Sequence, residues 1–124
     1  MRALADRVTT GPKVEVEVQE GAGERASADA GWHLARVAEE AVTNAYKYAS
    51  ATRIRIELHL EKSQLVLRIR DDGAGFDLSQ GSKRGYGLVG MRERIEQLSG
   101  AFEIISAPGQ GTEVRAAVPA TAGA

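Results

Sequence analysis

The alternation of apolar and polar residues is the feature that most constrains how this sequence can fold. In residues 13–19, 53–61 and 65–69 every second residue is apolar. This is the pattern of strands that turn one side toward a core and the other toward solvent. The short segment Lys62-Ser63 between the second and third of these runs predicts a hairpin.

Two more strands are expected at residues 102–106 and 112–118, on either side of a turn at Pro108-Gly109-Gln110-Gly111. Strands therefore outnumber helices, and short hairpins join several of them. The economical architecture is an α+β fold, a two-layer sandwich of a mixed, mostly antiparallel sheet with helices on one face.

Two segments have helical spacing of their apolar residues. The first begins at a cap formed by Ser27 or Asp29 and runs to about Ser50. The second covers about residues 88–98 and is closed by Gly100. We expect the helices to cover one face of the sheet and the first strand, residues 13–19, to be half-buried.

The length of 124 residues suits one compact domain. We expect a lead-in at residues 1–12, the domain at residues 13–118 and a flexible tail at residues 119–124. With 16 Lys and Arg against 17 Asp and Glu, the net charge of −1 gives no indication of a nucleic-acid partner. There is no cysteine and no apolar run of the roughly 20 residues that a membrane span needs. We therefore expect a cytoplasmic fragment that makes no membrane contact, whether or not a full-length protein is anchored.

Asp71 conflicts with the pattern around it. Leu65, Leu67 and Ile69 face the core, and Asp71 continues their parity, so a carboxylate ends an inward-facing row. A buried carboxylate needs a hydrogen-bond donor, either from the protein's own turn or from a ligand amine. The following sequence Gly73-Ala74-Gly75 favours the ligand, because residues without side chains let a flat ring approach the backbone.

A second group of candidates lies on the first helix. Glu40, Asn44 and Lys47 follow one another at i, i+4 and i+7, which places them along one line of the helix. An Asn oxygen suits Mg²⁺, which takes one or two protein ligands beside phosphate oxygens. Glu40 could accept a proton from a nucleophile near that ion. The alternative is a solvated helix face with a Glu–Lys pair.

The glycines before the second helix form a third candidate site. Gly85-Tyr86-Gly87-Leu88 opens that helix, whose free N–H groups and positive dipole end favour phosphate. The polar segment before it, residues 76–84, predicts a lid in which Lys83 and Arg84 reach anionic oxygens. Thr112, after the last turn, could hydrogen-bond a ligand or the neighbouring backbone.

These motifs occur in the order of a known family. The segments Glu40–Ala49, Asp71–Gly75, Gly85–Leu88 and Gly109–Thr112 resemble the N box, the two glycine boxes and the terminal G-x-G-T of sensor histidine kinase ATP-binding domains. The likeness covers residues 13–118 and implies the Bergerat fold, which is shared with gyrase-type ATPases.

The resemblance also implies roles at the base end of a nucleotide site. Asp71 would accept a hydrogen bond from the adenine amino group, and Thr112 would support it through water. Gly75 would lie against the base, with Gly73 beside it in the same motif.

At the phosphate end, Asn44 would hold Mg²⁺ on the phosphates of ATP. Glu40 is the catalytic candidate that activates the nucleophile, and Lys47 would contact phosphate. The other nucleotide-binding residues implied are Tyr48, Lys83, Arg84, Gly85, Tyr86, Gly87 and Leu88. Tyr48 stands where a subfamily of these kinases often has His.

That subfamily pairs with NarL-type response regulators, and Glu39–Asn44 and Gly87–Arg94 resemble its motifs. The family transfers the γ-phosphoryl group of ATP to a His on a separate dimerisation domain, which no segment of this chain resembles. We therefore expect a catalytic fragment with little activity alone. Its expected partners are ATP, Mg²⁺, that phosphoacceptor domain and, through the full-length kinase, a NarL-type regulator.

Three alternatives remain. One is a serine kinase of the anti-sigma type, which this length suits, although the run Gly90-Met-Arg-Glu-Arg94 favours the histidine kinases. The second is a nucleotide sensor without enzymatic activity. The third is a gyrase-like ATPase module that couples hydrolysis to dimer closure.

Overall fold

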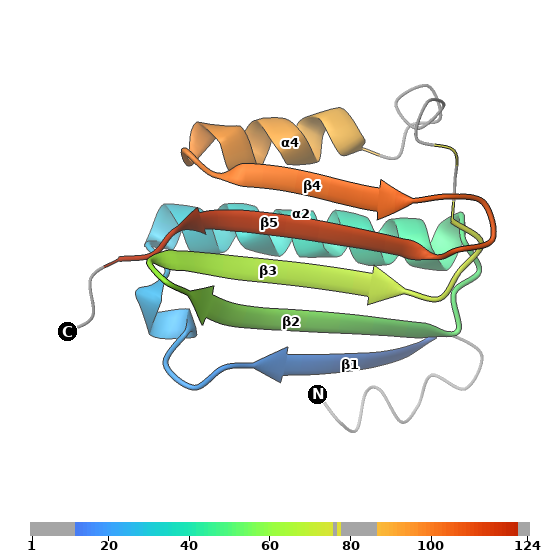
Figure 1. Ribbon diagram of the computed structural model, residues 1–124, viewed down its shortest axis with the longest axis horizontal. Helices are drawn as coiled ribbons and strands as arrows, with labels where there is room; N and C mark the ends of the chain where they lie inside the picture. Colours follow the sequence, from blue (N-terminus) through green and yellow to red (C-terminus); the bar gives the residue numbers. More distant parts are fainter. Residues whose placement is uncertain (1–11, 76, 78–86, 122–124) are drawn as a thin grey trace.

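The structure of the chain is a computed structural model, which describes residues 12–75, 77 and 87–121. Figure 1 shows one sheet with its helices on one side. The sheet has the order β1-β2-β3-β5-β4, in which β1 is parallel to β2 and the other pairs are antiparallel. The predicted α+β sandwich with a mixed, mostly antiparallel sheet is confirmed. In chain order, the elements are β1 (Lys13–Val18), the 3₁₀ helix η1 (Gly23–Arg25), α2 (Ala28–Lys47), β2 (Arg53–Glu61), β3 (Gln64–Asp71), α4 (Leu88–Gln97), β4 (Ala101–Ser106) and β5 (Thr112–Pro119).

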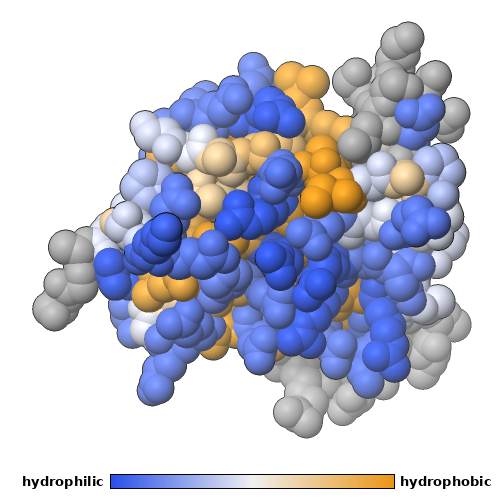
Figure 2. Space-filling model, in the orientation of Figure 1, coloured by the Kyte–Doolittle hydropathy of each residue, from blue (hydrophilic) through white to orange (hydrophobic). Residues whose placement is uncertain are grey.

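The register of the strands separates an apolar face from a charged one. Leu67 of β3 lies between Leu58 of β2 and Ala116 of β5, and these side chains share the face toward the helices. The opposite face carries rows of Arg and Glu, including Glu57 and Arg68, and it is mostly hydrophilic in Figure 2. One face is thus left to build the core against α2 and α4.

The helix α2 begins at the expected cap, where the Ser27 side chain accepts a hydrogen bond from the Ala30 N–H at 3.0 Å. Its apolar face is buried, and the helix ends at Lys47, three residues before the predicted end. The helix α4 ends at Gln97, and the left-handed residue that follows it is Ser99, one position before the predicted closing residue Gly100. Gly100 is required for space instead, because a Cβ there would lie 2.4 Å from the Ala117 carbonyl oxygen.

The strand β1 lies where it was predicted, but it is not half-buried. All six of its residues are exposed, and the Val16 side chain is 63% exposed. β1 is an edge strand, and in Figure 1 the helices lie over the opposite part of the sheet. Alternation therefore identified the strand correctly, but burial depends on what covers it.

The last strand reaches into the segment that we expected as a tail. β5 runs to Pro119, and the amides of the next two residues donate hydrogen bonds, Ala120 to the Ser63 carbonyl at 2.9 Å and Thr121 to the Arg25 carbonyl at 2.7 Å. Residues 120 and 121 are thus held to the β2–β3 turn and to η1. Residues 122–124, like most of the predicted lead-in, lie outside the described residues.

Asp72 ties the end of β3 to the segment that leads from α2 into β2. Its carboxylate accepts hydrogen bonds from the Thr52 N–H at 2.8 Å, the Arg53 N–H at 2.9 Å and the Thr52 hydroxyl at 2.5 Å. The hydrogen bond from the Thr52 hydroxyl, followed by those from the backbone, lowers the pKa of Asp72. This link fixes the next residues of the chain relative to the end of the helix.

The variant Asp72→Ala should therefore lower the free energy of unfolding at pH 7 by about 1 kcal/mol, because three donors lose their acceptor. A lowered pKa contributes stability above the ordinary value of 3.8 that is lost as the pH falls through the folded value. The difference from wild type should thus shrink in acid. Urea denaturation at several pH values measures it, with Glu96→Ala, an exposed carboxylate on α4, as the control. A difference that is the same at every pH would contradict the electrostatic origin.

Candidate functional site

Three polar residues end three neighbouring apolar rows at the same edge of the sheet. Asp71 ends the row of β3, Thr112 begins that of β5 and Ser106 ends that of β4. Thr112 is the register partner of both, so the side chains of all three point to the helix side. A polar edge on an otherwise apolar face indicates a binding site.

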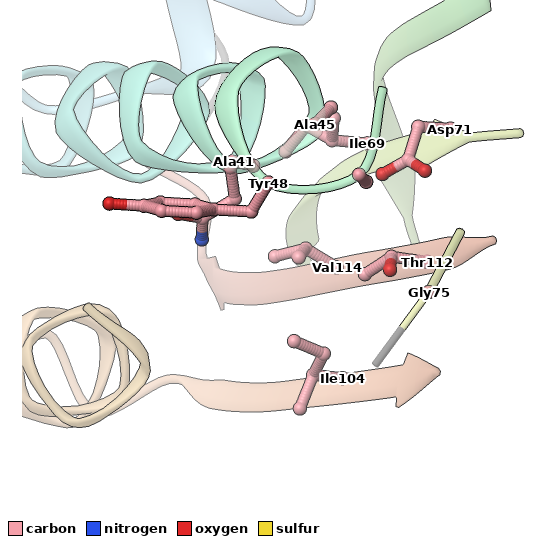
Figure 3. A pocket seen from close by; sticks show the side chains of 11 residues that line it. Ala41, Ala45, Tyr48, Ile69, Asp71, Gly75, Ile104, Thr112 and Val114 are labelled. Carbon is pink, nitrogen blue, oxygen red and sulfur yellow. The ribbon is translucent and has the colours of Figure 1, made fainter. Parts of the chain in front are cut away.

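A pocket opens at this edge between the sheet and α2 (Figure 3). Asp71 and Thr112 lie at one end of it, and the Tyr48 ring lies along the helix at the other. Its cavity volume is about 20 Å³, which is room for water and not for a purine ring. A base would therefore enter only with movement of the lining side chains. The lining residues are Ala41, Asn44, Ala45, Tyr48, Ala49, Ile69, Asp71, Gly75, Ile104, Thr112 and Val114.

Asp71 combines a structural contact with a place in the pocket. Its Oδ1 accepts a hydrogen bond from the Gly73 N–H at 2.8 Å, which is the turn contact that we considered as the alternative. Asp71 lines the pocket as well, so one carboxylate serves both. Burial raises the pKa of Asp71, and the nearby charge of Asp72 adds to the rise. The N–H groups of Gly73 and Thr112 lower this pKa and offset part of the rise.

The glycines near Asp71 are required by contacts within the protein. A Cβ on Gly75 would lie 2.1 Å from the Ala107 carbonyl oxygen, and a Cβ on Gly111 would lie 2.3 Å from the Asp71 carbonyl oxygen. Both residues also have positive φ. A Cβ on Gly73 would lie 2.6 Å from the Ala49 Cβ. These glycines let the end of β3 pack closely on the β4–β5 turn and the end of α2, and Gly75 also lines the pocket.

The three residues predicted to lie along one line of α2, Glu40, Asn44 and Lys47, do not share one hollow. Asn44 lines the pocket, whereas Glu40, one turn earlier, lines a groove between α2 and α4. The Glu40 carboxylate lies against Gly87, the N-cap of α4, where a Cβ would be 2.9 Å from Oε2. A carboxylate at a helix N-terminus interacts favourably with the helix dipole. Lys47 is exposed in the last turn and is not among the residues that line either hollow.

Of the remaining predicted residues, Tyr48 lines the pocket and is 52% exposed, and Leu88 packs against the core. Lys83, Arg84, Gly85 and Tyr86 lie outside the described residues. The predicted lid and the first glycine of its motif therefore stay predictions.

Two kinds of residue at the site were not predicted from the sequence. The pocket has apolar walls, with Ile104 and Val114 on one side and small residues such as Ala41 and Ala45 on the other. The alanine spacing along α2 was a signal that the helix leaves room there. Ser106 was also missed, although it is a polar residue that continues the inward parity of Phe102 and Ile104.

Asn44, the residue predicted to hold Mg²⁺, is among those that line the pocket. Among the described residues there is no group of three or more His, Cys, Asp or Glu side chains that could hold a metal ion. An ion near the Asn44 oxygen would take most of its ligands from phosphate and water, as Mg²⁺ does beside nucleotides.

The chain belongs to the family of histidine kinase-, DNA gyrase B-, and HSP90-like ATPases, whose model matches residues 30–122. It is 34% identical over 106 residues to the sensor histidine kinase LiaS of Bacillus subtilis, which covers 86% of this chain and 29% of LiaS. It is 36% identical over 87 residues to the sensor protein VraS of Staphylococcus haemolyticus, which covers 70% of this chain and 25% of VraS. The chain thus spans less than a third of the length of these relatives.

The fold is similar to a solved histidine kinase domain, from the blue-light activated histidine kinase EL346 of Erythrobacter litoralis. The TM-score is 0.64 at 21% identity, covering 86% of this chain and 51% of that chain. Within the described residues, no helix is both long and apolar enough to cross a membrane.

The raised pKa of Asp71 predicts how Asp71→Asn changes stability. Asn keeps an oxygen for the Gly73 N–H and removes a half-buried charge. Burial makes ionisation of Asp71 costlier in the folded than in the unfolded chain, so its contribution to stability is full below the ordinary pKa of 3.8 and falls as the pH rises through the folded value. The variant should therefore be at least as stable as wild type at pH 7, and its advantage should vanish in acid. Urea denaturation tests this, and a variant clearly less stable at pH 7 would refute it.

Proposed function

We propose that this chain is the ATP-binding catalytic domain of a sensor histidine kinase of the NarL-partnered subfamily. On this proposal it transfers the γ-phosphoryl group of ATP to a His on a separate dimerisation domain. The observation that carries the proposal is the inward-facing carboxylate of Asp71 beside Thr112, at the end of an apolar pocket in a chain of this ATPase family.

The base end of the site is built for a ring that carries an amino group. The apolar walls exclude water from the faces of a ring, and the Asp71 carboxylate is an acceptor for an exocyclic N–H. Gly75 and Thr112 line the same pocket. The binding of adenine would offset the cost of a carboxylate that burial penalises.

The phosphate end lies along α2 toward α4. Asn44 would hold Mg²⁺ on the phosphates, where the ion neutralises charge, and Lys47 in the next turn would contact a phosphate oxygen. Glu40, near the N-terminus of α4, would orient or deprotonate the attacking group. Transfer of a phosphoryl group needs mainly positioning and charge neutralisation, which these groups can supply.

Calorimetric titration tests the binding step. Wild type should bind ATP in the presence of Mg²⁺, and Asp71→Asn should lower the affinity for both ATP and ADP by at least tenfold, because an amide donor then faces the adenine amino group. The variant should remain folded, as its expected stability allows. Unchanged affinity would remove Asp71 from the site.

The variant Asn44→Asp separates the metal role from the base role. We expect the affinity for Mg²⁺-ATP to fall by at least about tenfold, since a carboxylate adds negative charge beside the phosphates. The affinity for adenosine, which has no phosphate, should change less than about threefold. Titration of both ligands with and without Mg²⁺ measures this, and equal losses would contradict a metal role.

The transfer step is tested with ATP labelled at the γ-phosphate. The chain is mixed with the phosphoacceptor domain of LiaS, and acid-labile label on a His of that domain is the expected result. Acid-stable label on Ser would indicate the serine kinase, and release of phosphate without any acceptor would indicate the ATPase module. Binding without transfer or hydrolysis would indicate the sensor.

A further inference from the structure

A chain of hydrogen bonds runs behind the pocket at the polar edge of the sheet. The Ser106 hydroxyl donates to the Gly111 carbonyl oxygen at 2.9 Å, and it lies 2.8 Å from the Thr112 hydroxyl. In the sheet, Thr112 is paired with Asp71 on one side and with Ser106 on the other. Thr112 and Asp71 line the pocket, and Ser106 does not. Ser106 thus lies outside this pocket, in a neighbouring hollow that it lines together with Asp71 and Thr112.

The direction of these two hydrogen bonds follows from the number of protons that the hydroxyl groups can donate. A carbonyl oxygen can only accept, so the Gly111 carbonyl uses the single proton of the Ser106 hydroxyl. With the Ser106 proton on the Gly111 carbonyl, the contact between the two hydroxyls has Thr112 as the donor and Ser106 as the acceptor. With its own proton directed at Ser106, the Thr112 hydroxyl presents only lone pairs to the pocket.

Asp71 presents the same polarity beside it. Its Oδ1 accepts a hydrogen bond from the Gly73 N–H at 2.8 Å, so this side chain already acts as an acceptor in the fold. The end of the pocket thus carries two neighbouring acceptors, Asp71 and the Thr112 hydroxyl. A ligand edge that meets both has to supply hydrogens, either directly or through one water that donates to each.

We infer that Ser106 is a positioning residue that sets the base specificity of the nucleotide site, by holding the Thr112 hydroxyl as an acceptor. The inference rests on the proposed function and extends it to a residue that does not line the pocket. An amino group at purine C6 offers two N–H donors to this edge. An oxo group there offers only lone pairs, which would face two acceptors, and such a mismatch of buried polar groups is strongly rejected.

The test compares ATP with inosine triphosphate, which differs in carrying the oxo group at C6 and a hydrogen at N1. Wild type should prefer ATP by about a hundredfold or more. In Ser106→Ala the Thr112 hydroxyl can rotate and donate to an oxo group, so the ratio of the two dissociation constants should fall at least about tenfold. Ser106→Thr, which keeps a hydroxyl, should restore the wild-type ratio. Ser63→Ala, in the exposed β2–β3 turn, is the matched control for loss of a serine hydroxyl.

A second comparison tests whether Ser106 acts through Thr112. In the background of Thr112→Val, which has no hydroxyl to orient, adding Ser106→Ala should leave the ratio unchanged within about twofold. Circular dichroism and the urea midpoint establish that each variant is folded. A ratio that Ser106→Ala does not change, or changes equally without Thr112, overturns the inference while leaving the ATP site intact. A wild-type chain that binds neither nucleotide instead refutes the proposed function.

Discussion

The pairing of β3 with β5 is the interaction on which the site depends. It brings Asp71 opposite Thr112, residues 41 positions apart in the sequence, at one edge of the sheet and on the face toward α2. The close approach is possible because Gly111 has no Cβ to meet the Asp71 carbonyl oxygen, and Gly75 none to meet that of Ala107. The glycine motifs are thus required to assemble the site, in addition to any contact that they make with a ligand.

The same edge is held from the helix side. Asp72 binds the start of β2, and the Ala74 N–H donates to the Ala49 carbonyl at 2.8 Å, so the end of β3 is attached to the end of α2. Asn44 and Tyr48 therefore keep a defined position relative to Asp71. One carboxylate of the adjacent acidic pair orders the backbone and the other reaches the pocket, which explains why their pKa values move in opposite directions.

Much of the fold could be predicted because its elements have strong local signals. The alternation in β2 and β3, the Ser27 cap and the turn at Lys62-Ser63 are each encoded within a few residues. Asp71 could be identified as a site residue because it breaks an apolar row, and Asn44 because it shares a helix face with Glu40. The exposure of β1 could not be predicted, since it depends on helices that lie over the other strands. Ser106 gave only a weak signal, one polar residue at a strand end.

The sequence by itself determined the strands, the helices, which side chains face inward and the family motifs. These features are set by neighbouring residues and by the repeat of side-chain directions along a helix or a strand. Only the tertiary structure decided which inward-facing polar groups meet. It separated Glu40 from the pocket and placed it against Gly87, and it left Lys47 outside both hollows. It also placed Ser106 where it determines the direction of the Thr112 hydroxyl. Ser106, Gly111 and Thr112 belong to one hairpin, but their hydrogen bonds depend on how its two strands face each other, and the period of the sequence does not record this.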